Sequence, residues 1–200
     1  MIKNIIFDFG DIFINLDKQA VYRDLAKYGH PALTPEMDTL AKTYEVGKIS
    51  SPDFIKELQR LVPKATAEEI TQAWNSILLD FPESRLHFIE QLAADKQYRL
   101  FLLSNTNDLH IDYVKKTMGL DRFQRFQACF EQFYLSHEIH LRKPNLDIYQ
   151  FVLNENDLKP QESFFVDDTK ENTDAAEGLG ITTWHLKVGE EDITDLKAKL

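Results

Sequence analysis

Short apolar runs that alternate with amphipathic segments constrain the fold of this 200-residue chain more than any other feature. The clearest run is Ile5–Phe7, which is followed directly by Asp8 and then by Gly10. A short run without alternating polar positions is typical of a strand that is buried on both faces. Strands that alternate with helices predict parallel β-α-β units. We therefore expect an α/β fold with a three-layer core around a parallel sheet.

Similar runs predict the other elements of this core. Strands are expected at 100–103, 129–134, 164–166 and 181–184, and helices at 86–93, 109–118, 148–153 and 173–179. Between the first strand and the rest, residues 17–81 contain helix signals but no strand signal. This interruption predicts an all-helical insert, with the core formed by residues 1–16 and 82–200.

The insert carries the start signals of several helices. Thr34-Pro35 and Ser51-Pro52 each place a helix-capping residue before a proline of the first turn. Thr66 and Glu69 have the spacing of a capping box, and Gly47 is placed to end a helix. These signals predict four helices.

Composition excludes several classes of partner. The chain has 23 basic and 33 acidic residues, and this net charge of −10 disfavours binding to nucleic acid or to an anionic membrane surface. No apolar run approaches the ~18 residues of a membrane span. The single Cys129 permits no internal disulfide, and Asp8 and Asp11 interrupt the apolar N-terminus, which argues against a signal peptide. We expect a cytoplasmic protein; the oligomeric state is left open.

Polar side chains follow the predicted strands in a consistent order. Asp8 ends the first strand, Ser104-Asn105-Thr106 ends the second, Arg142-Lys143-Pro144 follows the third, and Asp167-Asp168 ends the fourth. A single carboxylate there would be an ordinary helix cap. Because ligands bind at the carboxyl ends of strands in an open parallel sheet, the whole series indicates a functional site.

These residue types suit phosphoryl transfer. Three carboxylates in a small volume repel one another unless a cation lies between them, and Mg²⁺ prefers such oxygen ligands. A carboxylate can attack phosphorus and form an aspartyl phosphate. Lys143 can pair with phosphate oxygens, and Ser104 can donate a hydrogen bond to them.

The same residues carry a family resemblance. Phe7-Asp-Phe-Gly-Asp-Ile12, Leu102-Leu-Ser-Asn-Thr106, Arg142-Lys-Pro144 and Phe165-Val-Asp-Asp168 with Asn172 resemble motifs I to IV of the haloacid dehalogenase (HAD) superfamily. They occur in the right order and span nearly the whole chain. The helical insert resembles a C1-type cap, and the motifs are most similar to the branch that includes glucose-1-phosphate phosphatases. The resemblance implies a Rossmann-like core.

The resemblance also implies roles for individual residues. Asp8 would be the nucleophile of a Mg²⁺-dependent phosphatase acting on a small phosphate ester such as a sugar phosphate. Asn172 would support the metal site from the next helix. The implied metal ligands are Asp8, Gly10 through its carbonyl group, Asp168 and Asp167, and the implied phosphate-binding residues are Ser104, Asn105 and Lys143.

One position departs from the family pattern. Phosphatases of the family usually have a second aspartate two residues after the nucleophile, where it acts as general acid and base. This chain has Gly10 there and Asp11 one residue later. Asp11 is therefore a candidate for proton transfer, with a surface or turn carboxylate as its alternative. Without a general acid, catalysis loses ~10²–10⁴ in rate and favours good leaving groups.

Two other functions fit parts of the pattern. A metal-independent 2-haloacid dehalogenase would use the same nucleophile on carbon, but it would not need Asp167 and Asp168. A non-catalytic protein that binds phosphate ligands would explain Gly10. His110 could reach the site, but a packing or surface position is the preferred interpretation. Trp74 could contact the leaving group, but a core position is preferred.

Overall fold

The computed structural model describes all 200 residues and contains one five-stranded sheet in which every neighbouring pair is parallel. The spatial order is β3-β2-β1-β4-β5. The strands are β1 (Asn4–Phe7), β2 (Arg99–Ser104), β3 (Gln132–Leu135), β4 (Ser163–Asp167) and β5 (Thr182–His185). The predicted α/β class is confirmed, and each strand lies within a few residues of its predicted position.

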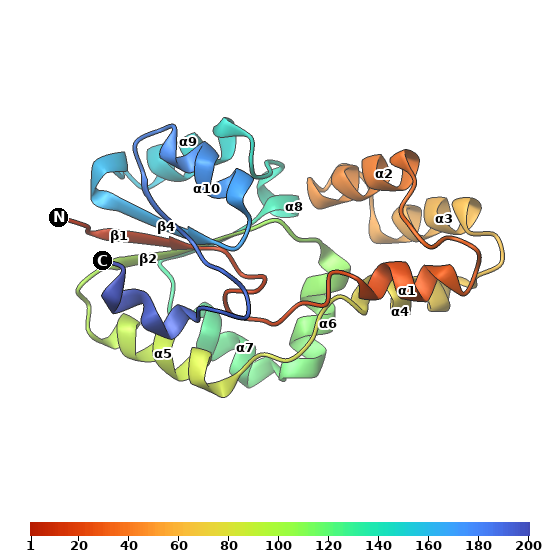
Figure 1. Cartoon of the computed structure of the whole chain (residues 1–200), viewed down its shortest axis with the longest axis horizontal. Helices are drawn as coiled ribbons and strands as arrows, with labels where there is room; N and C mark the ends of the chain where they lie inside the picture. Colours follow the sequence, from red (N-terminus) through yellow and green to blue (C-terminus); the bar gives the residue numbers. More distant parts are fainter.

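Helices cover both faces of the sheet (Figure 1). One face is covered by α9 (Leu146–Glu155) and α10 (Lys170–Glu177), and the other by α5 (Glu83–Ala94), α6 (Asp108–Met118) and α7 (Leu120–Gln127). Successive strand residues point to opposite faces. Accordingly, Ile5 and Phe7 pack with α5 and α6, whereas Ile6 packs with α9. Burial on both faces explains why the strand is a continuous apolar run.

Four further helices follow β1 and form what we call the helical lobe. They are α1 (Ala20–Ala26), α2 (Pro35–Glu45), α3 (Ser51–Leu61) and α4 (Ala67–Asn75). The lobe has its own apolar cluster, in which the rings of Tyr44 and Phe54 stack with centroids 4.2 Å apart. Thr34 and Thr66 cap α2 and α4 as predicted, but Ser50, not Ser51, caps α3 because the helix begins one residue earlier.

The helical lobe meets the rest of the chain at its connection to the core, at α8 (Ser136–Ile139), and at α6, which α4 contacts. Where the chain enters and leaves the lobe, Leu16 and Leu78 form an antiparallel bridge, and Asn15 N–H donates to the Asp80 carbonyl at 2.9 Å. The helix that contacts α8 is α2, as Figure 1 also shows. The space between the connection and α8 faces the carboxyl ends of the strands.

Some elements had no counterpart in the sequence analysis. They are α7, α8 and two short 3₁₀ helices, η1 (Pro160–Glu162) and η2 (Ile193–Ala198). None of the helices has the length and apolar character that crossing a bilayer would require.

Candidate active site

The strand order brings residues from distant parts of the sequence to one crevice. From β1 the sheet continues through β2 and β3 on one side, and the chain then crosses over to β4 and β5 on the other. Successive strands are therefore added on one side of β1 and then on its other side, beside β4. Ligands bind at this switch point in open α/β sheets. Asp8 directly follows β1, and Asp167 ends β4.

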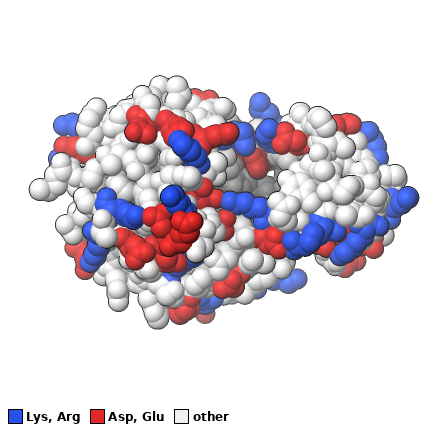
Figure 2. All heavy atoms as spheres, viewed as in Figure 1, with Lys and Arg blue, Asp and Glu red and all other residues white.

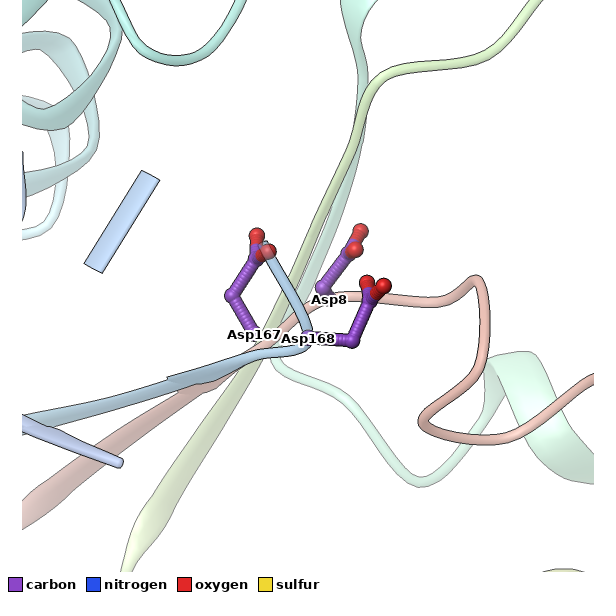
Figure 3. Close-up of side chains that lie close together, drawn as sticks. All are labelled: Asp8, Asp167 and Asp168. Atoms are coloured by element: carbon purple, nitrogen blue, oxygen red, sulfur yellow. The ribbon is translucent and has the colours of Figure 1, made fainter. Parts of the chain in front are cut away.

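Three carboxylates meet in this crevice. Asp8, Asp167 and Asp168 each offer an oxygen, and these oxygens all lie within 4.8 Å of one another. Figure 3 shows the three side chains turned toward a common region at the ends of their strands. Asp167 is fully buried and Asp8 is 8% exposed. Three of the four predicted metal-binding residues are therefore brought together.

Lys143 is the cation between two of these carboxylates. Its Nζ lies 2.7 Å from an oxygen of Asp8 and 2.7 Å from an oxygen of Asp167, and its side chain is 1% exposed. Burial opposes a charge on Lys143, but the attraction of Asp167 and Asp8 outweighs it and raises the pKa of Lys143. For Asp8 the balance is different: burial raises its pKa to about 7, Asp167 and Asp168 add to this rise, and Lys143 opposes it.

Asp167 and Asp168 have different surroundings. Asp167 accepts hydrogen bonds from Lys143, from the Thr169 N–H at 2.8 Å, and from the Asn172 amide at 3.0 Å to each oxygen. Its oxygens are therefore occupied by the protein. The side chain of Asp168 is only 5% exposed, and its carboxylate pairs with the exposed side chain of Lys18 alone. Of the pair, Asp168 has fewer protein partners and is therefore the better candidate to bind an external ligand.

The last residue of β2 and the loop that follows it form the next wall of the site; we call residues 104–107 the β2 loop. Ser104 is buried, and its hydroxyl makes no hydrogen bond within the chain. Together with Gly10 it lines a small cavity of about 120 Å³. The Asn105 side chain accepts from the N–H of Lys143 and donates to its carbonyl, both at 2.9 Å. Asn105 thus fixes the backbone of Lys143, and its amide is not directed to a ligand.

The comparison with known families agrees with this arrangement. Residues 5–185 match the family described as haloacid dehalogenase-like hydrolase, from β1 through β5. The chain belongs to the haloacid dehalogenase-like hydrolase family. The family expectation from the four motifs is thereby confirmed. Three motifs of this HAD-like protein lie at the ends of β1, β2 and β4, and the motif that contains Lys143 follows α8.

Individual relatives of the HAD-like chain cover nearly its full length. D-ribitol-5-phosphate phosphatase from Bacteroides thetaiotaomicron is 29% identical over 197 residues, which are 96% of this chain and 95% of that protein. A HAD family enzyme from the same organism, solved as a magnesium complex, is 34% identical with a TM-score of 0.85, over 95% of this chain and 96% of that one. A HAD-like family hydrolase from Porphyromonas gingivalis is 30% identical with a TM-score of 0.85, over 100% and 98% of the two chains.

Gly10 stands where the HAD pattern usually has its second aspartate. A Cβ added to Gly10 would lie 2.8 Å from the Leu16 side chain, so Leu16 would have to move to admit any larger residue. Leu16 belongs to the backbone bridge at the entry to the lobe. The close atom is Cδ1, the far end of a flexible side chain, so a small rotation of Leu16 would make room for a Cβ at position 10.

Asp11 does not join the three carboxylates. The chain turns after β1, and Asp11 adopts a positive φ of 55°. One of its oxygens accepts from the Leu16 N–H at 2.9 Å, and the other lies 3.0 Å from the Lys18 ammonium. These contacts explain the residue as a loop-stabilising carboxylate, so the geometry does not favour the candidate role in proton transfer.

A second cavity of about 200 Å³ lies between the helical lobe and the core. Figure 2 shows a hollow there, with charged side chains of both signs along its rim. The polar residues that line this cavity are Lys18, Tyr22, Asp38, Lys42, Glu45, His110 and Arg142. Glu45 pairs with Arg142 at 3.1 Å; burial raises the pKa of Glu45, and Arg142 opposes this rise. Both cavities are lined by Glu45, Ile77 and His110, so they are adjacent to each other.

His110 and Trp74 both pack and line the site. Their rings stack with centroids 5.3 Å apart, and His110 Nε2 donates to the Trp74 carbonyl at 3.1 Å. Burial lowers the pKa of His110 to about 4, so the ring is neutral. Its Nδ1 is then free to accept from Asn107, which also caps α6. Trp74 and His110 therefore pack as the sequence analysis preferred, but both also line the cavity.

Sequence reasoning missed Lys18 and Glu45 as residues of the site. Both belong to or adjoin the helical lobe, where no motif marks them. The sequence marks them only as charged residues in the insert, which is expected to pack near the carboxyl ends of the strands. Only the packing of the lobe against the core brings them to the cavity.

Proposed function

We propose that this protein is a Mg²⁺-dependent phosphatase that uses Asp8 as nucleophile on a small phosphate ester. The observation that carries this proposal is the contact of Lys143 with Asp8 and Asp167 beside the carboxylate of Asp168, whose one partner is the exposed Lys18. It combines a nucleophile, a cation for phosphate oxygens and a candidate metal site in one crevice. Relatives named as a phosphatase and as a magnesium complex support it.

The donor set fits Mg²⁺. The cluster has three carboxylates and only two cations, the buried Lys143 and the exposed Lys18. This deficit of positive charge contributes to the raised pKa of Asp8. Asp8 and Asp168 would hold the ion, the Gly10 carbonyl lies on the adjoining loop, and Asp167 would orient Lys143. When bound, Mg²⁺ supplies positive charge that offsets the repulsion between the carboxylates and a phosphate dianion.

The reaction proceeds in two displacements on phosphorus. A carboxylate oxygen of Asp8 attacks the phosphorus atom, the bond to the ester oxygen breaks, and the leaving alkoxide takes a proton from solvent. Water then attacks the phosphorus of the aspartyl phosphate, which releases inorganic phosphate and restores Asp8. Throughout, Lys143 and the Ser104 hydroxyl bind oxygens of the transferred group, while Asn105 holds the Lys143 backbone.

We further propose that the helical lobe, residues 17–81, acts as a cap over a core of residues 1–16 and 82–200. The phosphoryl group would lie against Asp8, Lys143 and Ser104, beside the cavity at Gly10. The leaving group would extend into the cavity lined by Glu45 and Arg142. A lining with charges of both signs suits hydroxyl groups, which donate and accept hydrogen bonds. A small sugar or polyol phosphate is the substrate class that this lining and the ribitol-phosphate relative support.

Release of inorganic phosphate from a panel of phosphate esters, with Mg²⁺ or with EDTA, tests the function. We expect turnover of sugar or polyol phosphates with Mg²⁺ alone, and a loss of about 10³-fold or more in Asp8→Asn. Asp174→Asn is the matched control, since it removes one exposed acidic charge from nearby α10. Full activity of Asp8→Asn would refute the proposal, and halide release from 2-chloropropionate in EDTA would favour a dehalogenase.

A further inference from the structure

The hydroxyl group of Ser136 lies between the β2 loop and the helical lobe. Ser136 is the first residue of α8 and is fully buried. Its Oγ accepts a hydrogen bond from the Thr106 N–H at 2.9 Å, and it lies 3.0 Å from the Thr106 carbonyl and 2.6 Å from the Glu45 carbonyl. A hydroxyl has one proton. It can therefore donate to only one carbonyl at a time, and the shorter distance favours Glu45.

The end of α2 depends on core side chains. The last carbonyls of a helix have no partner within the helix. Here the Glu45 carbonyl accepts from Ser136, and the Val46 carbonyl accepts from His140 Nδ1 at 2.9 Å. The Glu45 carboxylate pairs in addition with Arg142. All three partners lie in residues 136–142, directly before Lys143. We call this segment the seat of the helical lobe.

Gly47 makes the fit between lobe and seat unusually close. Its φ is +65°, and a Cβ at this position would lie 2.1 Å from the His137 carbonyl oxygen. No real Cβ contact is this short, so any larger residue would move the end of α2 away from α8. Gly47→Ala is therefore a variant that disturbs the seat without touching the Ser136 side chain.

We propose that Ser136 is a positioning residue that couples the seating of the helical lobe to the geometry of the β2 loop. When the lobe is seated, the hydroxyl donates to Glu45, and a hydroxyl that donates is a stronger acceptor for the Thr106 N–H. When the lobe moves away, the proton turns to the Thr106 carbonyl, and the loop loses its link to the lobe. The inference rests on the proposed function because it takes Ser104 of this loop to bind the phosphoryl group.

Hydrogen exchange at the Thr106 amide in the full-length, ligand-free protein tests the coupling. We expect Ser136→Ala to speed this exchange about tenfold, since it removes the acceptor, and Gly47→Ala to speed it by about threefold by weakening that acceptor. Combining the two substitutions should add nothing to Ser136→Ala alone. Ser163→Ala is the matched control. Ser163 is also fully buried and donates to a carbonyl at 2.8 Å, but it begins β4, whereas the site lies where β4 ends.

Binding of inorganic phosphate in the presence of Mg²⁺, measured by calorimetry, tests the consequence for the site. Ser136→Ala should weaken phosphate binding about tenfold, and Ser163→Ala should leave it unchanged. Two results would overturn the inference: folded Ser136→Ala matching Ser163→Ala in both measurements, or unchanged Thr106 exchange in Gly47→Ala. If the wild-type protein neither binds phosphate nor hydrolyses any ester, the proposed function fails, whereas the exchange data still decide on the coupling.

Discussion

The ammonium group of Lys143 lies 2.7 Å from the carboxylate of Asp8, although the two residues are 135 positions apart in the sequence, with the helical lobe and two strands between them. Both side chains are buried, so each depends on the other for its charge. The contact joins the proposed nucleophile to the residue that would neutralise the phosphoryl group.

Replacing Lys143 by methionine should destabilise the metal-free protein. The substitution keeps the length of the side chain but leaves Asp8 and Asp167 without their buried counter-charge. Breaking a buried ion pair by removing one partner costs about 3–5 kcal/mol. Urea denaturation in EDTA measures the loss. The double variant Lys143→Met with Asp167→Asn should recover part of it, and a loss below ~1 kcal/mol for the single variant would contradict the assigned pairing.

Mg²⁺ should raise the melting temperature through Asp168. A ligand at a hundred times its Kd stabilises the folded state by about 2.7 kcal/mol, which corresponds to ~5–10 °C for a chain of this size. Thermal denaturation with Mg²⁺ and with EDTA measures this shift. Asp168→Asn should abolish it, whereas the exposed Asp174→Asn should retain it. An equal shift in both variants would place the ion elsewhere.

His110 should make stability depend on pH. Its pKa of about 4 in the folded protein lies below the usual 6.5 because the ring is buried. As the pH falls below 6.5, the unfolded chain takes up this proton before the folded one does, so stability is lost between pH 6.5 and about 4. His110→Gln should flatten this part of the profile of unfolding free energy against pH. His87→Gln, at an exposed histidine of α5, is the control, and identical profiles for the two variants would be inconsistent with a buried neutral ring.

Asp11 should affect stability rather than proton transfer. Asp11→Asn keeps an oxygen for the Leu16 N–H and tolerates the positive φ, whereas Asp11→Ala does neither. We expect the alanine variant to be less stable than the asparagine variant by about 1–2 kcal/mol, as measured by urea denaturation.

The leaving-group dependence of the same two variants checks this assignment. The ratio of kcat/KM for p-nitrophenyl phosphate to that for an alkyl phosphate should be the same as in the wild type. A general acid would behave differently, because its loss slows poor leaving groups by about 10²–10⁴ and spares good ones. Such a selective loss in Asp11→Asn would restore Asp11 as the proton donor.

Much of the fold was predictable because its signals are local. A strand buried on both faces must be a continuous apolar run, and Ile5–Phe7 is one. Helix caps are likewise set by neighbouring residues, as at Thr34 and Thr66. The cap of α3 is Ser50, one residue before the predicted Ser51, since helix ends depend on small differences in backbone geometry.

The sequence by itself determined which polar residues end the strands, and parallel pairing then obliges Asp8, Asp167 and Asp168 to meet at one edge of the sheet. Only the tertiary structure decided where Asp11 and Asn105 point, because loop torsions orient their side chains. It alone decided that Ser136 joins the β2 loop to α2 as well. That contact depends on how two separately packed apolar clusters lie against each other, and no local pattern records it.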